Sequence, residues 1–95
     1  MARTPVIRIE LGNVTSAQEL HALLMESLDF PGWYGRNWNA FWDAITALVE
    51  MPEQLILDGW QQFSLRMPDE AQLMRKCLED MSGQYPRLSS TVVYV

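Results

Sequence analysis

Residues 29–50 read DFPGWYGRNWNAFWDAITALVE, and this stretch joins a glycine-containing loop to the start of a helix. Asn37 is a favourable N-cap residue, so the sequence predicts a helix over about residues 38–50 that stops before Pro52. Apolar residues recur at helical spacing through the segment, which predicts one continuous stripe facing the core: Trp38, Phe41, Trp42, Ile45, Leu48 and Val49. The loop places Trp33 outside this helix, so we expect Trp33 to be exposed and Trp38 and Trp42 to lie mainly in the core.

A polar stripe runs along another face of the same predicted helix. It repeats at spacings of four, three and four residues and consists of Asn39, Asp43, Thr46 and Glu50. A polar stripe is ordinarily a solvated helix face. This one follows a loop in which Trp33 and Tyr34 stand between Gly32 and Gly35, two residues that permit positive φ. Exposed Trp and Tyr are enriched at protein interfaces, so the pattern favours a protein-binding surface.

The flanking sequence supplies the rest of an α/β pattern. VIRIEL (6–11), LILDGW (55–60) and STVVYV (90–95) read as strands. Ser16 and Glu19 form a capping-box pattern before an apolar helical face that includes Ala17 and Leu20, and Pro31 follows the helix. A short helical turn is expected in QQFSLRM (61–67), then a long helix capped by Asp69 and ended by Gly83. Strands separated by helical crossovers predict three parallel strands packed with about four helices, in a single domain over 1–95.

Composition and charge restrict the classes of function. The chain has 95 residues, of which 48% are hydrophobic and 20% charged, and its net charge is −5. Its seven basic residues are scattered, which argues against direct nucleic-acid binding, whereas net acidity suits either simple solubility or a basic protein partner. One cysteine, no signal-peptide pattern and no apolar run of membrane-spanning length lead us to expect a soluble cytoplasmic protein with no membrane partner.

Residues that carry acid–base or nucleophilic chemistry are sparse. The single histidine, His21, lies mid-helix and is expected to be a partly exposed helical residue. Cys77 falls on the apolar face of its own helix, which favours a buried, inert thiol. No CxxC, HExxH or P-loop pattern is present, so no metal or cofactor is expected. Acid pairs such as Glu79–Asp80 leave carboxylate-pair chemistry open, but nothing singles out two of them. We therefore expect no enzymatic activity.

The central stretch resembles the barstar family, the intracellular inhibitors of barnase-like ribonucleases. The family pattern runs aromatic-Tyr-Gly-x-Asn, then apolar-Asp-Ala-Leu-Trp-Asp, with a proline after the helix. The matching stretches here are WYGRN (33–37), WNAFWD (38–43) and the proline of EMP (50–52). The resemblance extends to VIRIELGN and its following helix, to LILDGWQQF and to STVVYV, and so covers nearly the whole chain. It implies a three-stranded parallel sheet with helices, which the periodicity also predicts.

The resemblance further implies a function. In the family, the loop and the polar face of the second helix plug a ribonuclease active site, where carboxylates stand in for RNA phosphates. The implied partner is thus a ribonuclease toxin that is basic at its active site, and this protein would be its immunity protein or antitoxin. Glu79 is a weaker correspondence to an acidic contact on the last helix, because the match is offset by one residue. The expected partner-binding residues are Trp33, Tyr34, Gly35, Arg36, Asn39, Asp43, Thr46, Glu50 and Glu79.

Two positions depart from the family pattern. Asn39 stands where the family has its first aspartate, and Arg36 stands at a loop position that is acidic or neutral in the family. The positive charge of Arg36 would be repelled by a basic cleft. Either Arg36 points away from the partner, or the partner differs from barnase. We favour a divergent partner, such as a toxin domain of a bacterial competition system. The alternative is a regulatory or scaffolding module that kept the fold and lost ribonuclease inhibition.

Overall fold

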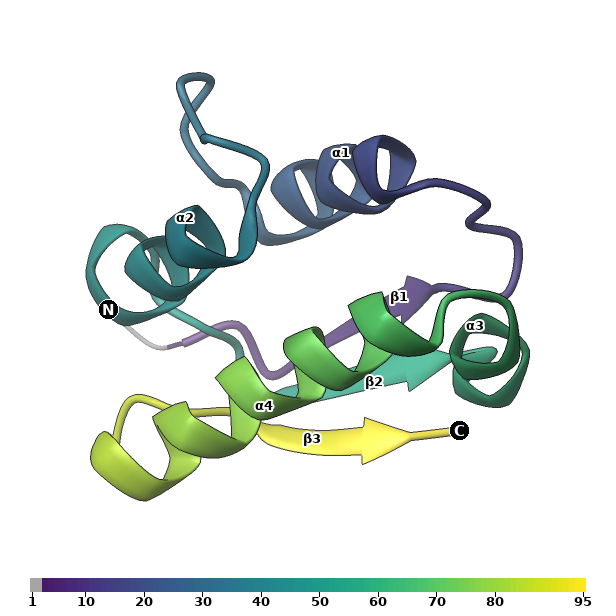
Figure 1. The fold of residues 1–95 in the computed structure, drawn as a ribbon. Helices are drawn as coiled ribbons and strands as arrows, with labels where there is room; N and C mark the ends of the chain where they lie inside the picture. The colour runs from purple at the N-terminus through teal and green to yellow at the C-terminus, as the bar shows by residue number, and fades with distance from the viewer. Residues whose placement is uncertain (1–2) are drawn as a thin grey trace.

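The computed structural model describes residues 3–95, and its elements alternate as the sequence predicts (Figure 1). The short helical turn expected over residues 61–67 is a helix of its own that begins at Trp60, so the second strand ends at Asp58 and not at residue 60. The sequence of elements is β1 (Val6–Glu10), α1 (Ala17–Leu28), α2 (Trp38–Asp43), the π-helical turn η1 (Ala44–Leu48), β2 (Gln54–Asp58), α3 (Trp60–Arg66), α4 (Pro68–Gln84) and β3 (Thr91–Tyr94). No helix among residues 3–95 is long and apolar enough to cross a membrane.

The sheet has the strand order β1-β2-β3, and both strand pairs are parallel. This confirms the predicted three-stranded parallel sheet with four helices. Leu55 and Leu57 of β2 are fully buried, and with Ile9 they mark the face that packs on the helices. The opposite face is polar at its edge, where the Arg8 guanidinium lies 3.1 Å from the Asp58 carboxylate. Because successive side chains of a strand point to opposite faces, one face of the sheet is covered by helices and the other is open.

Helix α1 begins where the capping pattern places it. The Ser16 hydroxyl accepts a hydrogen bond from the Glu19 amide at 3.1 Å, which satisfies one of the free amides of the first turn. The Glu19 carboxylate accepts from the Thr15 hydroxyl at 3.3 Å. The helix ends at Leu28, before Pro31, because Asp29 adopts a left-handed conformation with φ of 59°. Ala17, expected on the buried face, is exposed in the first turn.

The predicted helix over residues 38–50 is not one regular helix. Its start is confirmed, because the Asn37 side chain accepts from the Ala40 amide at 2.7 Å. After Asp43 the chain widens into η1, in which the Val49 amide donates to the Ala44 carbonyl group at 3.1 Å, an i to i−5 bond. A π-turn carries more residues per turn than an α-helix, so it rotates later residues out of phase. Leu48, expected in the apolar stripe, is consequently exposed.

The bounds of α4 also differ from those expected. It begins at Pro68, a favourable first helical residue, so Asp69 lies inside the first turn and is not the cap. It continues through Gly83 to Gln84, so Gly83 does not end it. Leu73, expected on the inner face, is 44% exposed beside the fully buried Met74. These differences shift the faces of α4 without changing its place over the sheet (Figure 1).

The core gathers between the sheet and the helices. Phe41 is fully buried on α2, whereas Trp38 and Trp42 on either side of it are only half-buried against the core. Both tryptophans pack against the core, as expected, but the most buried residue of the apolar stripe is Phe41. Trp33 is 73% exposed, as predicted.

Candidate functional site

The loop before α2 is anchored by one aromatic residue and presents another. Tyr34, expected at the surface beside Trp33, is buried, and its ring packs on Phe30 with 4.8 Å between ring centroids. Its hydroxyl group lies 2.7 Å from Nδ1 of His21 on α1. Burial of Tyr34 fixes the path of the loop, and Trp33 projects from this path into solvent.

His21 is part of this anchor and is not the partly exposed residue predicted from the sequence. It is buried, and its ring lies 4.6 Å from the Trp38 ring between centroids. Burial lowers the pKa of His21 below its usual value of 6.5, while the charge of Glu70 opposes this effect and that of Arg36 adds to it. No local pattern predicts this hydrogen bond of His21, because the Tyr34 hydroxyl group comes from a loop 13 residues away.

The glycines of the loop act differently from the sequence-based expectation. Neither Gly32 nor Gly35 has positive φ, and Arg36 carries it instead, at 54°. Gly35 allows a close approach, because a Cβ atom there would lie 3.1 Å from the Cβ of Ala40, which is a tight contact. The loop therefore packs tightly on the first turn of α2 at Gly35, with Arg36 exposed at its end.

The outer face of α2 presents the two polar residues predicted at its centre. Asn39 and Asp43 are both exposed, one helical turn apart. They line a groove of about 570 Å³ between α2 and α4, whose floor includes the half-buried Trp42. Trp38 ties the two helices together, because its indole Nε1 donates to the Glu70 carboxylate at 2.7 Å. The Asp43 carboxylate is thus carried on a helix whose first turn is held by the Asn37 cap and by the Trp38–Glu70 hydrogen bond.

The remaining members of the predicted stripe diverge from this face. Thr46 is half-buried, and its hydroxyl group donates back to the carbonyl oxygen of Trp42 at 2.6 Å. Glu50 is exposed but follows η1 in extended chain, so it does not continue the helical stripe. The widened turn breaks the stripe after Asp43.

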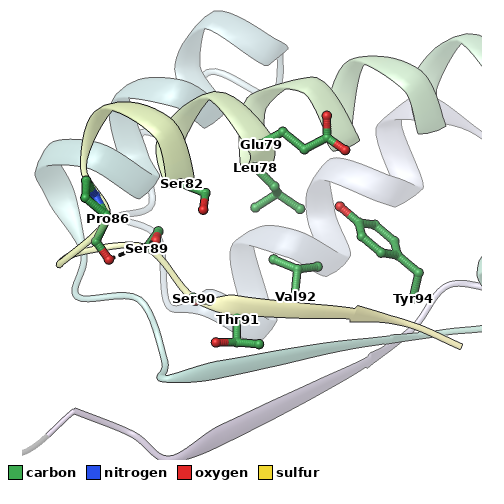
Figure 2. Close-up of a pocket in the computed structure, with 9 residues that line it drawn as sticks. All are labelled: Leu78, Glu79, Ser82, Pro86, Ser89, Ser90, Thr91, Val92 and Tyr94. Carbon is green, nitrogen blue, oxygen red and sulfur yellow. Dashed lines mark hydrogen bonds between the residues drawn. The ribbon is translucent and has the colours of Figure 1, made fainter.

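Glu79 lies on the other flank of α4 from the groove. Its carboxylate accepts from Arg75 at 2.9 Å, and it lines a separate hollow of about 430 Å³ with residues of β3 (Figure 2). Asp80, the next residue, lines the α2–α4 groove with Asp43 and pairs with Lys76 at 3.0 Å. Sequence reasoning missed Asp80. Its spacing of three from Cys77, which was predicted to face inward, would have placed it near this side of the helix.

Cys77 also lines the groove and is half-buried. Burial raises the pKa of its thiol, and Asp80 adds to the effect. A thiol with a raised pKa is a poor nucleophile, and the His21 Nδ1 is taken by Tyr34. Among residues 3–95, no three His, Cys, Asp or Glu side chains converge as they would around a metal ion.

Comparisons with known proteins show the family to which the chain belongs. The family model described as Barstar (barnase inhibitor) matches residues 4–95. A curated relative, the "Putative ribonuclease inhibitor YrdF" of Bacillus subtilis strain 168, is 45% identical over 42 residues. That alignment covers 44% of this chain, and it spans about half (46%) of the relative's length. Because the family model accounts for nearly all of the residues that form the sheet, the loop and the groove, the chain belongs to the barstar family.

Proposed function

We propose that this protein is a ribonuclease inhibitor, which lays the Trp33 loop and the outer face of α2 into the cationic active-site cleft of its partner. The observation that carries the proposal is that Trp33 and the Asp43 carboxylate are both exposed, on a chain that the barstar family model matches. A carboxylate presented on a rigid helix can replace an RNA phosphate among the basic residues of such a cleft. An inhibitor of this kind carries out no reaction of its own.

Pre-organisation supports the proposal. The loop is pinned through Tyr34 to His21, and the start of α2 is pinned through its Asn37 cap and through Trp38 to Glu70. Ordering a flexible loop on binding costs free energy, so a surface that is ordered in advance retains more of its contact energy. The loop and helix would enter a cleft as one body.

Charge supports it as well. Asp43 and Asp80 stand on the two walls of the groove, and Lys76 compensates only one carboxylate by pairing with Asp80. The net charge of the chain is −5. Opposite fields accelerate encounter with a basic partner, and this acceleration falls as salt rises. The proposed contact residues are Trp33, Tyr34, Gly35, Arg36, Asn39, Asp43, Thr46, Glu50 and Glu79, with Asp80 added from its position in the groove.

Asn39 and Arg36 suggest which ribonuclease is bound. Asn39 removes one carboxylate from the helix face, and the exposed Arg36 adds a cation at the end of the loop. The loss of one carboxylate weakens binding to a cleft that binds two anions. The added Arg36 cation strengthens binding to a partner that presents a hydrogen-bond acceptor at that position. We therefore propose a divergent ribonuclease toxin, with this protein as its immunity protein, as the partner.

The test is inhibition of RNA cleavage by a panel of purified barnase-like ribonucleases, including toxin domains. The parent protein should block at least one divergent member at stoichiometric amounts. Asn39→Asp should improve inhibition of barnase itself, because it restores an anion to the helix face. If the parent blocks no member, and Asn39→Asp does not change that, the ribonuclease proposal fails. The interaction-module alternative then stands.

A further inference from the structure

The two edges of the sheet differ in how they are protected. β1 is preceded by Pro5 and carries Arg8 and Glu10, which are features that disfavour pairing with another strand. β3 reads Thr-Val-Val-Tyr and contains no charge, proline or glycine. Within residues 3–95, no strand pairs with the outer side of β3. An unprotected, β-branched edge is a template for strand addition.

The backbone of β3 is ready for this addition. The Thr91 amide donates to the Glu53 carbonyl oxygen at 2.8 Å, and the Val95 amide donates to the Leu57 carbonyl oxygen at 3.0 Å. The backbone amide and carbonyl groups of the odd-numbered residues therefore point toward β2. In a regular ladder the intervening residues, Val92 and Tyr94, turn their amide and carbonyl groups toward the open edge. Two copies paired antiparallel about Val93 would set each Val92 opposite Tyr94 of the other copy. Each such pair exchanges two hydrogen bonds.

Helix α4 adds a self-complementary charge pattern above the same edge. The Arg75 guanidinium lies 4.9 Å from the centroid of the Tyr94 ring, and Glu79 lines the hollow beside Val92 (Figure 2). The Arg75–Glu79 ion pair therefore stands above the outer strand β3, with Arg75 over the Tyr94 ring and Glu79 beside the hollow that Val92 and Tyr94 line. In such a dimer, a two-fold axis at Val93 would bring Arg75 of each copy toward Glu79 of the other. The strand pairing and the two ion pairs would then form through the same symmetry operation.

The geometry points to a homodimer in which two copies join at β3 into one continuous six-stranded sheet. Tyr94 of each copy would lie against Val92 of the other, at the mouth of the 430 Å³ hollow. The Trp33 loop and α2 lie on the other side of the molecule from β3, so the dimer leaves them free, and Glu79 alone among the proposed contact residues lies at the β3 edge (Figure 1). The inference does not depend on the proposed function.

The test is sedimentation velocity from micromolar to millimolar protein, together with hydrogen exchange of the Val92 and Tyr94 amides. The parent should dimerise, and both amides should gain protection with concentration. Arg75→Glu opposes like charges across the axis and should weaken dimerisation by about tenfold or more, and Arg75→Glu with Glu79→Arg should restore it. The matched control is Lys76→Glu, which breaks the equivalent pair with Asp80 on the other flank and should leave dimerisation unchanged.

Circular dichroism checks that each variant keeps the fold, since both ion pairs are exposed and contribute little to stability. A parent protein that stays monomeric through this range overturns the inference. So does a dimer that forms without protecting Val92 and Tyr94, or one that is equally weakened by Lys76→Glu. These outcomes leave the ribonuclease proposal untouched, because RNA cleavage is measured separately.

Discussion

Nδ1 of His21 on α1 lies 2.7 Å from the hydroxyl group of Tyr34 in the loop that carries Trp33. This contact joins a residue of the interior to the segment proposed to enter the ribonuclease. Because both side chains are buried, the loop and α1 cannot separate without exposing an aromatic ring and breaking a hydrogen bond. The hydrogen bond and burial of His21 therefore help to hold the loop that positions Trp33.

Stability should fall as pH decreases below about 6.5. The pKa of His21 is lowered in the folded state, so the unfolded chain binds the proton first as pH falls through the ordinary value of 6.5. The loss continues until pH reaches the lowered folded pKa. Urea unfolding at a series of pH values should show this slope, and His21→Gln should abolish it. The chain has one histidine, so an NMR titration reads this pKa without ambiguity. A folded-state pKa above 6.5 would contradict the burial argument.

Tyr34→Phe should destabilise the fold by about 1–3 kcal/mol, because it leaves the His21 nitrogen buried without its hydroxyl partner. The ring is kept, so packing on Phe30 changes little. Urea denaturation measures the effect. Tyr85→Phe, on an exposed tyrosine, is the matched control and should be near neutral. Equal stability of the two variants would show that the hydrogen bond does not anchor the loop.

The π-turn can be tested by a pair of truncations. Phe41→Ala should cost about 3–5 kcal/mol, since its ring is fully buried. Leu48→Ala should cost about 0.5 kcal/mol or less, since Leu48 is 42% exposed. A regular α-helix through residue 48 would have buried Leu48 with Phe41. A Leu48→Ala cost that approaches the Phe41→Ala cost would therefore argue against η1.

Much of this fold follows from local sequence patterns. The strands, the Ser16 and Asn37 caps and the exposure of Trp33 depend on neighbours in sequence, and all were predicted. The wrong predictions concern residues whose burial depends on contacts with residues distant in sequence. Tyr34 and His21 are polar aromatic residues that are buried against each other, Phe30 and Trp38, none of which a local pattern brings together.

The candidate site shows the same limit. Periodicity placed Asn39 and Asp43 on one face, and the structure keeps them there. It could not foresee η1, because a π-turn changes the helical period without a distinctive sequence signal. The family correspondence pointed to Glu79, whereas the structure places Asp80 in the groove beside Cys77, as the spacing of three from Cys77 indicates.

Trp33→Ala should separate binding from stability. The side chain is 73% exposed, so its removal should change the free energy of unfolding by about 0.5 kcal/mol or less. A tryptophan at the centre of an interface typically contributes about 2 kcal/mol or more to binding. Thermal denaturation and calorimetric titration with an inhibited ribonuclease measure the two effects. Unchanged affinity would remove Trp33 from the proposed interface.

The most direct test of the proposed function is a binding titration of Asp43→Asn against the ribonuclease that the parent inhibits, at low and high salt. The substitution keeps the shape of the exposed side chain and removes its charge, so the partner's cations are left unpaired. Glu19→Gln, which removes one charge from the far helix α1, is the control. We predict that Asp43→Asn loses about 2 kcal/mol or more of binding free energy while Glu19→Gln loses about none, and that salt slows association of the parent more than of Asp43→Asn. Parent-like affinity in a folded Asp43→Asn variant would contradict the account and leave α2 a purely structural element.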